Sequence, residues 1–339
     1  MKEDMLIMAV ESSCDETSAA VLRGGREVLS DVISSQIAIH QKYKGVVPEI
    51  ASRCHTQCIA AVAQEAVQRA GIAWKDIDAV AVTAGPGLVG GLLVGVSFAK
   101  GLSYSLGVPF VGVHHIEGHI SANFITNKQL EPPFMALVVS GGHSHIVLCR
   151  DYCSYELIGC TRDDAAGEAF DKVARVLGLP YPGGVHIDRL ARQGNGEAFK
   201  FNSALAHQDN FDFSFSGIKT GVINLVHKLA QNGQSLPVED IAASFQEFVC
   251  RNLTEKTVRA AVKYAQNKIV LAGGVAANSR LREMLEAECK KANMSFFAPE
   301  SILCTDNAAM IGCAGYYRLM RGYTSDLTLN AEASMSLFG

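Results

Sequence analysis

The sequence lacks an excess of basic residues, which limits how the protein could bind nucleic acid. Lysine and arginine together number 30 and aspartate and glutamate 34, so the formal net charge is -4. Because affinity for nucleic acid comes mostly from contacts to phosphates, such a chain has no general attraction for it. Binding would need a local basic patch or a basic partner protein. The candidates for the patch, which are otherwise ordinary surface residues, are His40, Lys42, Lys44, Arg53, His55 and Lys219.

The spacing of a zinc knuckle and the core of a secretion signal are also missing. Ten cysteines are present, but the near pairs Cys54/Cys58 and Cys149/Cys153 are not C-x2-C. The N-terminal apolar run MLIMAV ends at Glu11, which is too short for a signal peptide. We therefore expect reduced thiols and a cytoplasmic protein.

One long stretch lacks charge and must be weighed as a membrane span. Residues 79–99 (AVAVTAGPGLVGGLLVGVSFA) carry no charged side chain over 21 positions, about the length of a transmembrane helix. Gly85-Pro86-Gly87 interrupts the run early, and five glycines lie within it. These breaks favour a strand, a glycine loop and the start of a helix, and we expect no membrane span.

Two arrangements each occur twice along the chain. Residues 5–22 and 134–149 each read as two apolar strands around a tight turn of small residues, ESSCDETS and SGGHS, which is typical of a β-hairpin. Residues 78–102 and 268–285 each read as a strand, a glycine loop and a helix. Glycines at this place let a ligand approach the backbone, and the helix N-terminus favours anions.

This repetition predicts an α/β fold with mixed sheets and two similar lobes. We expect one lobe over 1–133, with a helix at 307–320 packing back on it, and a second over 134–330. The second half is longer, which places an insertion rich in turn residues at about 160–240. Two facing lobes predict a ligand cleft lined by both hairpin turns. Further helices are expected at 56–70 and 239–267.

The stretch VHHIEGH, residues 113–119, contains three histidines and one glutamate. In a helix that begins near 115, His115 and His119 are i and i+4, so both imidazoles could bind one metal ion. His114 would point elsewhere. A zinc protease needs H-E-x-x-H, whereas Glu117 stands between the two histidines and points away from their face. The alternative to a metal site is that this stretch is only the polar, hydrogen-bonded start of a helix.

A histidine pair needs further ligands, and CTDNAAMIG at 304–312 offers the best carboxylate, Asp306. Its ordinary interpretation is an N-cap of the following helix. Two histidines and one carboxylate leave open coordination positions, a set that suits Fe(II), with zinc as an alternative.

Two glycine turns could hold a ligand. SGGHS at 140–144 could cradle phosphate through backbone N–H groups, or be only a hairpin turn. LAGGVAAN at 271–278 has strand, glycines and helix in order, and Asn278 is also a plausible helix cap. Taken alone, Asp171, Gly184 and Asp188 would be solvated carboxylates or a turn glycine.

Together these motifs resemble the TsaD family, tRNA N6-adenosine threonylcarbamoyltransferase, formerly called O-sialoglycoprotein endopeptidase. The resemblance covers nearly everything from Leu6 to Asn330. It rests, in this order, on ESSCDETSAAV, GVVPEIASRCH, GPGLVGGLLVGVSFAKGL, HHIEGH, VVSGGHS, DDAAGEAFDKVARVLGLPYPGG, FSFSGIKT, LAGGVAANSRLR and TDNAAMIG. The implied fold is the duplicated actin-like ATPase fold (ASKHA, ribonuclease H-like), with two lobes around a nucleotide cleft. Lys44-Gly45 replaces the usual Gly-Gly, and Ser144 a common threonine, so we expect a changed surface loop and unchanged chemistry.

The resemblance also implies roles for individual residues. The histidine pair and Asp306 would bind a divalent metal, Fe2+ first, with Zn2+ or Mg2+ as alternatives. Glu11, Asp15 and His143 would face the reaction centre. The residues expected to hold the donor are Val138, Val139, Ser140, Gly141, Gly142, Asp171, Gly184, Asp188, Gly273, Gly274 and Asn278.

The implied reaction is an acyl transfer from threonylcarbamoyl-AMP to N6 of adenosine 37 in tRNAs that read ANN codons, with release of AMP. The implied partners are tRNA, a paralogous subunit of the same actin-like fold and a small P-loop ATPase. The alternatives are a small-molecule O-carbamoyltransferase, a metabolite kinase of the same fold, and a non-catalytic actin-like scaffold. A scaffold would leave the histidine pair and Asp306 without use.

Overall fold

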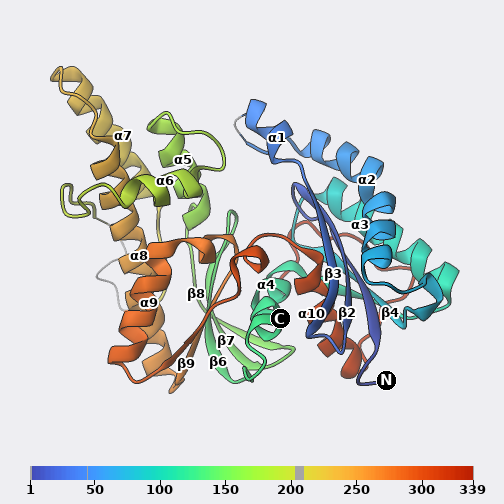
Figure 1. The fold of residues 1–339 in the computed structure, drawn as a ribbon. Helices are drawn as coiled ribbons and strands as arrows, with labels where there is room; N and C mark the ends of the chain where they lie inside the picture. The colour runs from blue at the N-terminus through green and yellow to red at the C-terminus, as the bar shows by residue number, and fades with distance from the viewer. Residues whose placement is uncertain (1, 44, 203–209, 339) are drawn as a thin grey trace. The chain divides into compact units, whose positions relative to one another are not determined.

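The structure is a computed structural model that describes residues 2–43, 45–202 and 210–338 (Figure 1). The chain forms two compact units. Unit 1 contains residues 2–132, 150–155 and 299–338, apart from residue 44. Unit 2 contains residues 133–149 and 156–298, apart from 203–209. Residues 299–338, which include the helix expected to pack back on the first lobe, cluster with unit 1.

Unit 1 is built on a five-stranded mixed sheet with strand order β3-β2-β1-β4-β5. Strand β1 pairs antiparallel with β2, as the predicted hairpin requires, and parallel with β4. The strands are β1 (Leu6–Glu11), β2 (Glu16–Arg23), β3 (Glu27–Ser35), β4 (Ala79–Gly85) and β5 (Phe110–His114). The central strands β1 and β4 are apolar up to Glu11 and Thr83 near their ends, because both faces of the sheet are covered.

The alternation of side chains along β1 and β4 divides the covering helices between the two faces. Val10 and Val82 belong to a cluster with Ile59 of α2 (Pro48–Arg69) and Val96 of α3 (Val89–Leu106). Their neighbours Ala9 and Ala81 face α10 (Ala308–Met320) on the other side. The remaining elements of the unit are α1 (Ile37–His40), η1 (Gln41–Tyr43), η2 (Trp74–Asp76), α4 (His115–Thr126) and η4 (Ser301–Leu303).

Helix α10 lies very close to the sheet because two of its residues have no side chain. A Cβ at Gly312 would stand 2.3 Å from Leu22 Cδ1, and one at Gly315 would stand 2.5 Å from the Ala81 Cβ. The predicted helix at 307–320 is confirmed, and it covers the sheet of unit 1.

Unit 2 repeats this plan with strand order β10-β9-β6-β7-β8. Strand β6 pairs antiparallel with β7 and parallel with β9, as β1 does with β2 and β4. The strands are β6 (Phe134–Val139), β7 (Ser144–Asp151), β8 (Ser154–Cys160), β9 (Lys268–Ala272) and β10 (Ser295–Phe297). The predicted α/β fold with two similar halves is confirmed.

Some helices of unit 2 lie in the stretch expected as the insertion, and others pack on its sheet. They are α5 (Ala166–Val176), α6 (Gly183–Ala191), α7 (Ser216–Gln231), α8 (Val238–Lys263), η3 (Gly274–Ala277) and α9 (Ser279–Lys291). Helices α5 to α7 lie in the stretch expected at 160–240, of which 203–209 is outside the described residues. Helix α8 packs against α6 and α9, and this contact joins the insertion to the repeated part of the unit.

One local expectation differs from the structure, and another agrees with it. The helix expected from residue 56 begins at Pro48, because proline at the first helical position starts a helix and the buried Ala51 and His55 continue its inner face. The uncharged run at 79–99 forms β4, a loop and α3, as expected. Of the described helices, α3 alone is long and apolar enough to be taken for a membrane span, and it packs against α2 and β4.

Candidate metal centre in unit 1 and glycine loops in unit 2

Strand β5 ends at His114 and helix α4 begins at His115, so VHHIEGH spans a strand end and a helix start. His114 is the N-cap of α4, and its Nδ1 accepts a hydrogen bond from the Ile116 N–H at 3.1 Å. Its Nε2 lies 3.0 Å from the Met335 carbonyl oxygen. As predicted, His114 does not join the histidine pair.

His115 and His119 lie on one face of α4, with ring centroids 4.6 Å apart and planes at 77°. Asp306 faces both rings: its Oδ1 is 3.5 Å from His115 Nε2 and 3.3 Å from His119 Nε2. One ligand atom from each of the three residues lies within 4.8 Å of the others. Both histidines are buried. The structure thus brings together the three residues expected to bind a metal.

The state of His119 supports a cation at this place. Its side chain is almost fully enclosed, yet within the described part of the chain neither ring nitrogen makes a hydrogen bond. Nε2 is near Asp306 but not at a hydrogen-bonding angle. Burial, followed by the charge of His115, lowers the pKa of His119, so the ring is neutral and its lone pair is available. A metal ion between the ring and the carboxylate would satisfy this buried atom.

His115 is oriented by Glu11, which stands behind it. Glu11 is fully buried, and its carboxylate accepts from Ser13 N–H at 2.5 Å and from Thr83 Oγ1 at 2.7 Å. Its Oε2 lies 3.1 Å from His115 Nδ1. A proton on Nδ1 leaves Nε2 free toward Asp306, the usual arrangement behind a metal-binding histidine. Glu11, which was expected to face the reaction centre, contacts His115, Ser13 and Thr83 in the structure.

The charges of His115 and Glu11 depend on each other. Burial lowers the pKa of His115, but Asp306 and Glu11 outweigh it and raise this pKa to about 9. Burial raises the pKa of Glu11, and the charge and hydrogen bond of His115 more than reverse this, so the net shift is downward. The two carboxylates on either side of the His115 ring therefore favour positive charge at this place.

Asn307, and not Asp306, caps the start of α10. Asn307 Oδ1 accepts from the Met310 N–H at 2.9 Å, so Asn307 is the N-cap. The alternative role of Asp306 as the cap is therefore wrong. The Ala308 N–H is bound by Ser18 Oγ at 2.9 Å. These contacts hold the start of α10 in place and leave Asp306 pointing at the histidines.

The hairpin turn ESSCDETS adds two more acidic side chains to this region. Asp15 is buried, and its Oδ2 is enclosed without a hydrogen bond from any described residue. Burial, then Asp15 and Asp306, raise the pKa of Glu16 to about 9. Glu16 is therefore protonated at neutral pH.

Glu117 lies on the opposite side of α4 from the histidines and binds α10. It is fully buried, and its Oε2 is 2.7 Å from Arg318 Nη1. The Tyr155 hydroxyl donates to its Oε1 at 3.5 Å. Helix α4 approaches α10 closely at Gly118, where a Cβ would stand 2.6 Å from Ile311 Cδ1. The ion pair and this close packing fix the helix that carries the histidines against the helix that follows Asp306.

In unit 2, the turn between β6 and β7 presents backbone in place of side chains. The Ser140 N–H donates to the His143 carbonyl at 2.8 Å, and the His143 N–H donates to Ser140 Oγ at 3.2 Å. Gly141 and Gly142 are exposed, and an added Cβ would meet nothing within 4 Å at either. Val138 and Val139 have fully buried side chains. These two valines can offer only backbone atoms to a ligand.

The loop after β9 contains two glycines with different roles. Gly273 has φ +89°, and a Cβ there would stand 2.4 Å from the Val139 carbonyl oxygen. It is therefore needed so that the loop can approach the end of β6. Gly274 has open space where a Cβ would be. Asn278, at the end of the loop, caps α9 by accepting from the Leu281 N–H at 2.9 Å.

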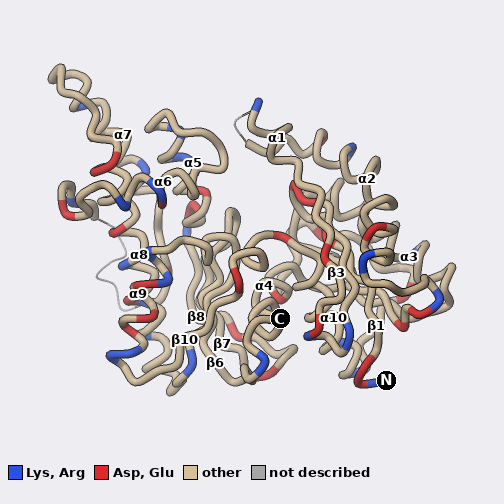
Figure 2. Tube along the Cα trace, in the orientation of Figure 1, with Lys and Arg blue, Asp and Glu red and all other residues tan. Residues whose placement is uncertain are grey.

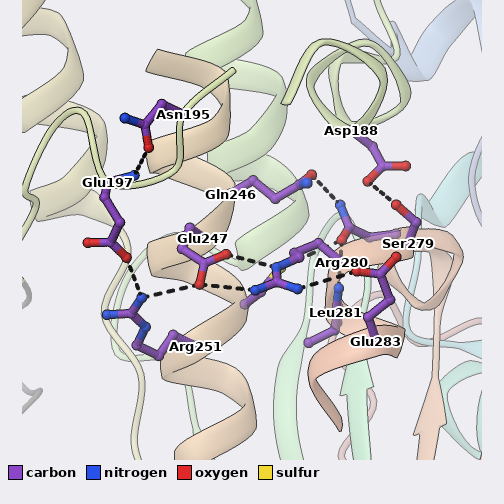
Figure 3. Close-up of polar contacts among 12 residues, drawn as sticks. Asp188, Asn195, Glu197, Gln246, Glu247, Arg251, Ser279, Arg280, Leu281 and Glu283 are labelled. Carbon is purple, nitrogen blue, oxygen red and sulfur yellow. Dashed lines mark hydrogen bonds and ion pairs between the residues drawn. The ribbon is translucent and has the colours of Figure 1, made fainter. Parts of the chain in front are cut away.

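Asp171, Gly184 and Asp188 lie on or next to α5 and α6. Asp171 Oδ1 accepts from the Gly183 N–H at 2.7 Å, which anchors the start of α6. Asp188 accepts from Ser279 Oγ at 2.8 Å, a contact that joins α6 to α9 beside Asn278 (Figure 3). All predicted donor residues and His143 belong to unit 2, whereas the metal ligands, Glu11 and Asp15 belong to unit 1.

The predicted basic patch is not formed by its histidines. His40 is buried and lies 3.2 Å from Gln36 Oε1, and His55 is buried between Thr17 and the Cys14 carbonyl. Lys219 is part-buried, and its Nζ lies 3.1 Å from Asp164. The exposed Arg53 pairs with Glu49, Lys42 is exposed, and Lys44 lies outside the described residues. Figure 2 shows acidic and basic positions mixed along the described chain.

The fold is of the actin-like, ASKHA type, as comparison with solved structures indicates. The chain is similar to HypF from T. kodakarensis, with a TM-score of 0.64 and 15% identity over 97% of this chain and 49% of that one. It is also similar to component A of the (R)-2-hydroxyglutaryl-CoA dehydratase from Acidaminococcus fermentans. There the TM-score is 0.55 and the identity 13%, over 93% of this chain and 99% of that one.

Sequence comparison identifies the family. The profile of TsaD, tRNA N6-adenosine threonylcarbamoyltransferase, matches residues 27–313. A protein of this name from Clostridium botulinum (strain Kyoto / Type A2) is 56% identical over 337 residues, which is 99% of both chains. One from Clostridium perfringens (strain SM101 / Type A) is 56% identical over 332 residues, 98% of both. The chain belongs to the TsaD family.

Proposed function

We propose that the protein transfers the threonylcarbamoyl group of threonylcarbamoyl-AMP to N6 of adenosine 37 in tRNAs that read ANN codons. The observation that carries this proposal is the 56% identity, over 99% of the chain, to a relative named as the transferase. The cluster of His115, His119 and Asp306 supports it from the structure. The enzyme is an acyltransferase whose products are the modified adenosine and AMP.

We further propose that His115, His119 and Asp306 hold one divalent cation, Fe2+ in preference to Zn2+ or Mg2+. A set of two histidines and one carboxylate leaves coordination positions open and suits Fe(II). A cation held by these three residues would supply Lewis acidity that polarises the donor. Glu11 would act as a positioning residue, since its carboxylate is already engaged by His115, Ser13 and Thr83.

The donor would be held by backbone and carboxylates of unit 2. The backbone of Val138 to Gly142 would lie against the donor, and the exposed glycines of this turn leave room for phosphate oxygens. Gly273 and Gly274 would allow approach of the adenine, which Asn278 would contact. Asp171, Gly184 and Asp188 would line the ribose. The open space at Gly274 supports this placement.

The reaction needs a bond exchange and one proton acceptor. The N6 amine forms a bond to the carbamoyl carbon, the bond from this carbon to the phosphate oxygen breaks, and AMP leaves with the electron pair. The amine then loses a proton. We propose Asp15 as the acceptor, because its Oδ2 has no hydrogen bond from the described residues, and His143 as the alternative. AMP is a good leaving group, so placement of the two substrates is the main task.

The partners would be tRNA, a paralogous subunit of the same fold and a small P-loop ATPase, in the cytoplasm. The net charge of -4 and the internal pairing of the candidate basic residues favour help from a partner in binding tRNA. Helix α3 exposes Val89, Leu93 and Tyr104, an apolar surface suited to a protein partner.

The test is a direct assay of the product. Purified protein, Fe2+, threonylcarbamoyl-AMP and unmodified tRNA are combined with and without the candidate partner subunits, and the nucleosides are measured by mass spectrometry. We expect the modified adenosine and one AMP for each group transferred. ATP turnover with a small-molecule acceptor would favour a metabolite kinase, and carbamoylation of a hydroxyl would favour an O-carbamoyltransferase. No modified adenosine with all partners present contradicts the proposal.

A further inference from the structure

The side chain of Asn278 has only one orientation that satisfies its neighbours. Its Oδ1 accepts from the Leu281 N–H at 2.9 Å and lies 3.6 Å from the Cys250 thiol. Backbone N–H is only a donor, so the oxygen must face α9 and the Nδ2 amide must point the other way. There Nδ2 donates to Gln246 Oε1 at 2.8 Å (Figure 3).

This contact passes the orientation on to Gln246 on α8. Because Asn278 presents a donor, Gln246 must present its oxygen to Asn278, and its Nε2 amide is left as the free end. Gln246 is 4% exposed. Among the described residues Nε2 has no hydrogen-bond partner. The fold does not enclose this atom completely, so a ligand could reach it. A buried amide with an unpaired, accessible donor is unusual in a finished core.

The free amide lies where three helices meet. Asn278, at the start of α9, contacts Gln246 on α8, and Ser279 on α9 contacts Asp188 on α6. Helix α8 packs against both of these helices. The next residue along α8 is Glu247, and its carboxylate is held by Arg280 at 2.8 Å and by Arg251 at 3.2 Å. Glu247 is therefore paired, whereas the Nε2 amide of Gln246 has no partner among the described residues.

We propose that Gln246 is a further binding residue of the donor site, and that its Nε2 donates to an acceptor ring nitrogen of the adenine in the AMP half. This inference rests on the proposed function, because it takes the nucleotide to lie beside Asn278. The Leu281 N–H fixes the orientation of the Asn278 amide, and Asn278 in turn fixes that of Gln246. The free end of Gln246 is therefore a donor. The pair therefore favours a base with an unprotonated ring nitrogen at this place.

The test measures AMP binding by calorimetry to the full-length protein and to two variants. Gln246→Glu keeps an oxygen for Asn278 and replaces only the free amide, and Gln246→Met removes both groups. Gln231→Glu, on the exposed end of α7, is the matched control for the added charge. We expect AMP to bind about tenfold or more weakly to both Gln246 variants, as loss of one buried hydrogen bond implies, and normally to the control.

A second set of ligands separates direct contact from a change of fold. In 1-deaza-, 3-deaza- and 7-deaza-AMP, one ring nitrogen is replaced by C–H. One analogue should bind the unaltered protein about tenfold more weakly than AMP, and this difference should vanish in Gln246→Met. If each variant keeps the same ranking of analogues, Gln246 does not contact the base and the inference is wrong. If the unaltered protein binds no AMP, the donor site in unit 2 fails as well.

Discussion

The turns of the two hairpins occupy equivalent places in the two sheets but have opposite chemistry. The turn after β1 lies among enclosed acidic groups, with Glu11 and Asp15 buried and Glu16 protonated. The turn after β6 is made of exposed glycines that offer backbone N–H groups. The same strand order therefore supports two kinds of site: one suited to a cation, the other to an anion.

The difference continues in the elements that complete each site. In unit 1, α4 and the start of α10 bring His115, His119 and Asp306 to the acidic turn. In unit 2, the loop after β9 brings Gly273 against Val139, and Asn278 follows at the start of α9. A duplicated scaffold thus fixes where side chains can gather, and the residues at the strand ends decide what they bind.

The largest expected effect comes from removing the histidine pair of unit 1. The double variant His115→Ala, His119→Ala should lose bound metal and at least about 100-fold of transferase activity, because two of three protein ligands are gone. Metal content by mass spectrometry and modified adenosine are the two measurements. His227→Ala, on an exposed position of α7, should change neither. Full metal content in the double variant would exclude this site.

The histidine pair shows how far the sequence alone could lead. The i, i+4 spacing in HHIEGH predicted one shared face, and the helix does begin at His115. The role of Glu11 could not be predicted, because its partners Thr83 and His115 are 72 and 104 residues away along the chain. For the same reason the sequence predicts His40 and His55 as surface residues, although both are buried, since nothing in their local pattern shows that they are enclosed.

The repeated hairpins and glycine loops made the fold predictable, because the same order of strand, turn and helix occurs twice. The site was less predictable wherever two polar residues compete for one task. Asp306 and Asn307 are both good N-caps, and only the structure shows that Asn307 takes this role. Gln246 carries no local signal, since its partner Asn278 is 32 residues away along the chain.

The next effect concerns stability, and it tests whether α4 depends on the buried ion pair. Arg318→Met leaves the fully buried Glu117 without its cation, which should lower the free energy of unfolding by about 3–5 kcal/mol. Urea unfolding measures this change. The double variant Glu117→Gln, Arg318→Met should recover much of the loss, because no unpaired charge remains. An equal loss in both variants would mean that packing of Arg318, and not its charge, holds α4.

A smaller effect separates the two glycines of unit 2. Gly273→Ala forces a side chain onto a left-handed backbone and against the Val139 carbonyl, which should lower the free energy of unfolding by about 1–3 kcal/mol. Gly274→Ala meets open space and should leave stability within about 0.5 kcal/mol. The same change at adjacent residues provides the control. If both variants unfold alike in urea, the close approach of this loop to β6 is not what requires glycine.

The smallest effect tests how much the buried acidic groups of unit 1 weaken the fold. Burial raises the pKa of Asp31 to about 6, against the ordinary 3.8, although Ser18 and the first N–H groups of α10 partly offset it. Because the folded protein holds this proton to higher pH than the unfolded chain, Asp31 lowers stability increasingly as pH rises from about 4 to 6. Asp31→Asn should therefore raise the free energy of unfolding by about 1–2 kcal/mol more at pH 8 than at pH 4, which is less than the full shift would give because Asp31 is only part-buried. Urea unfolding at both pH values measures this, and an equal change at both would show that the charge of Asp31 is already compensated by α10.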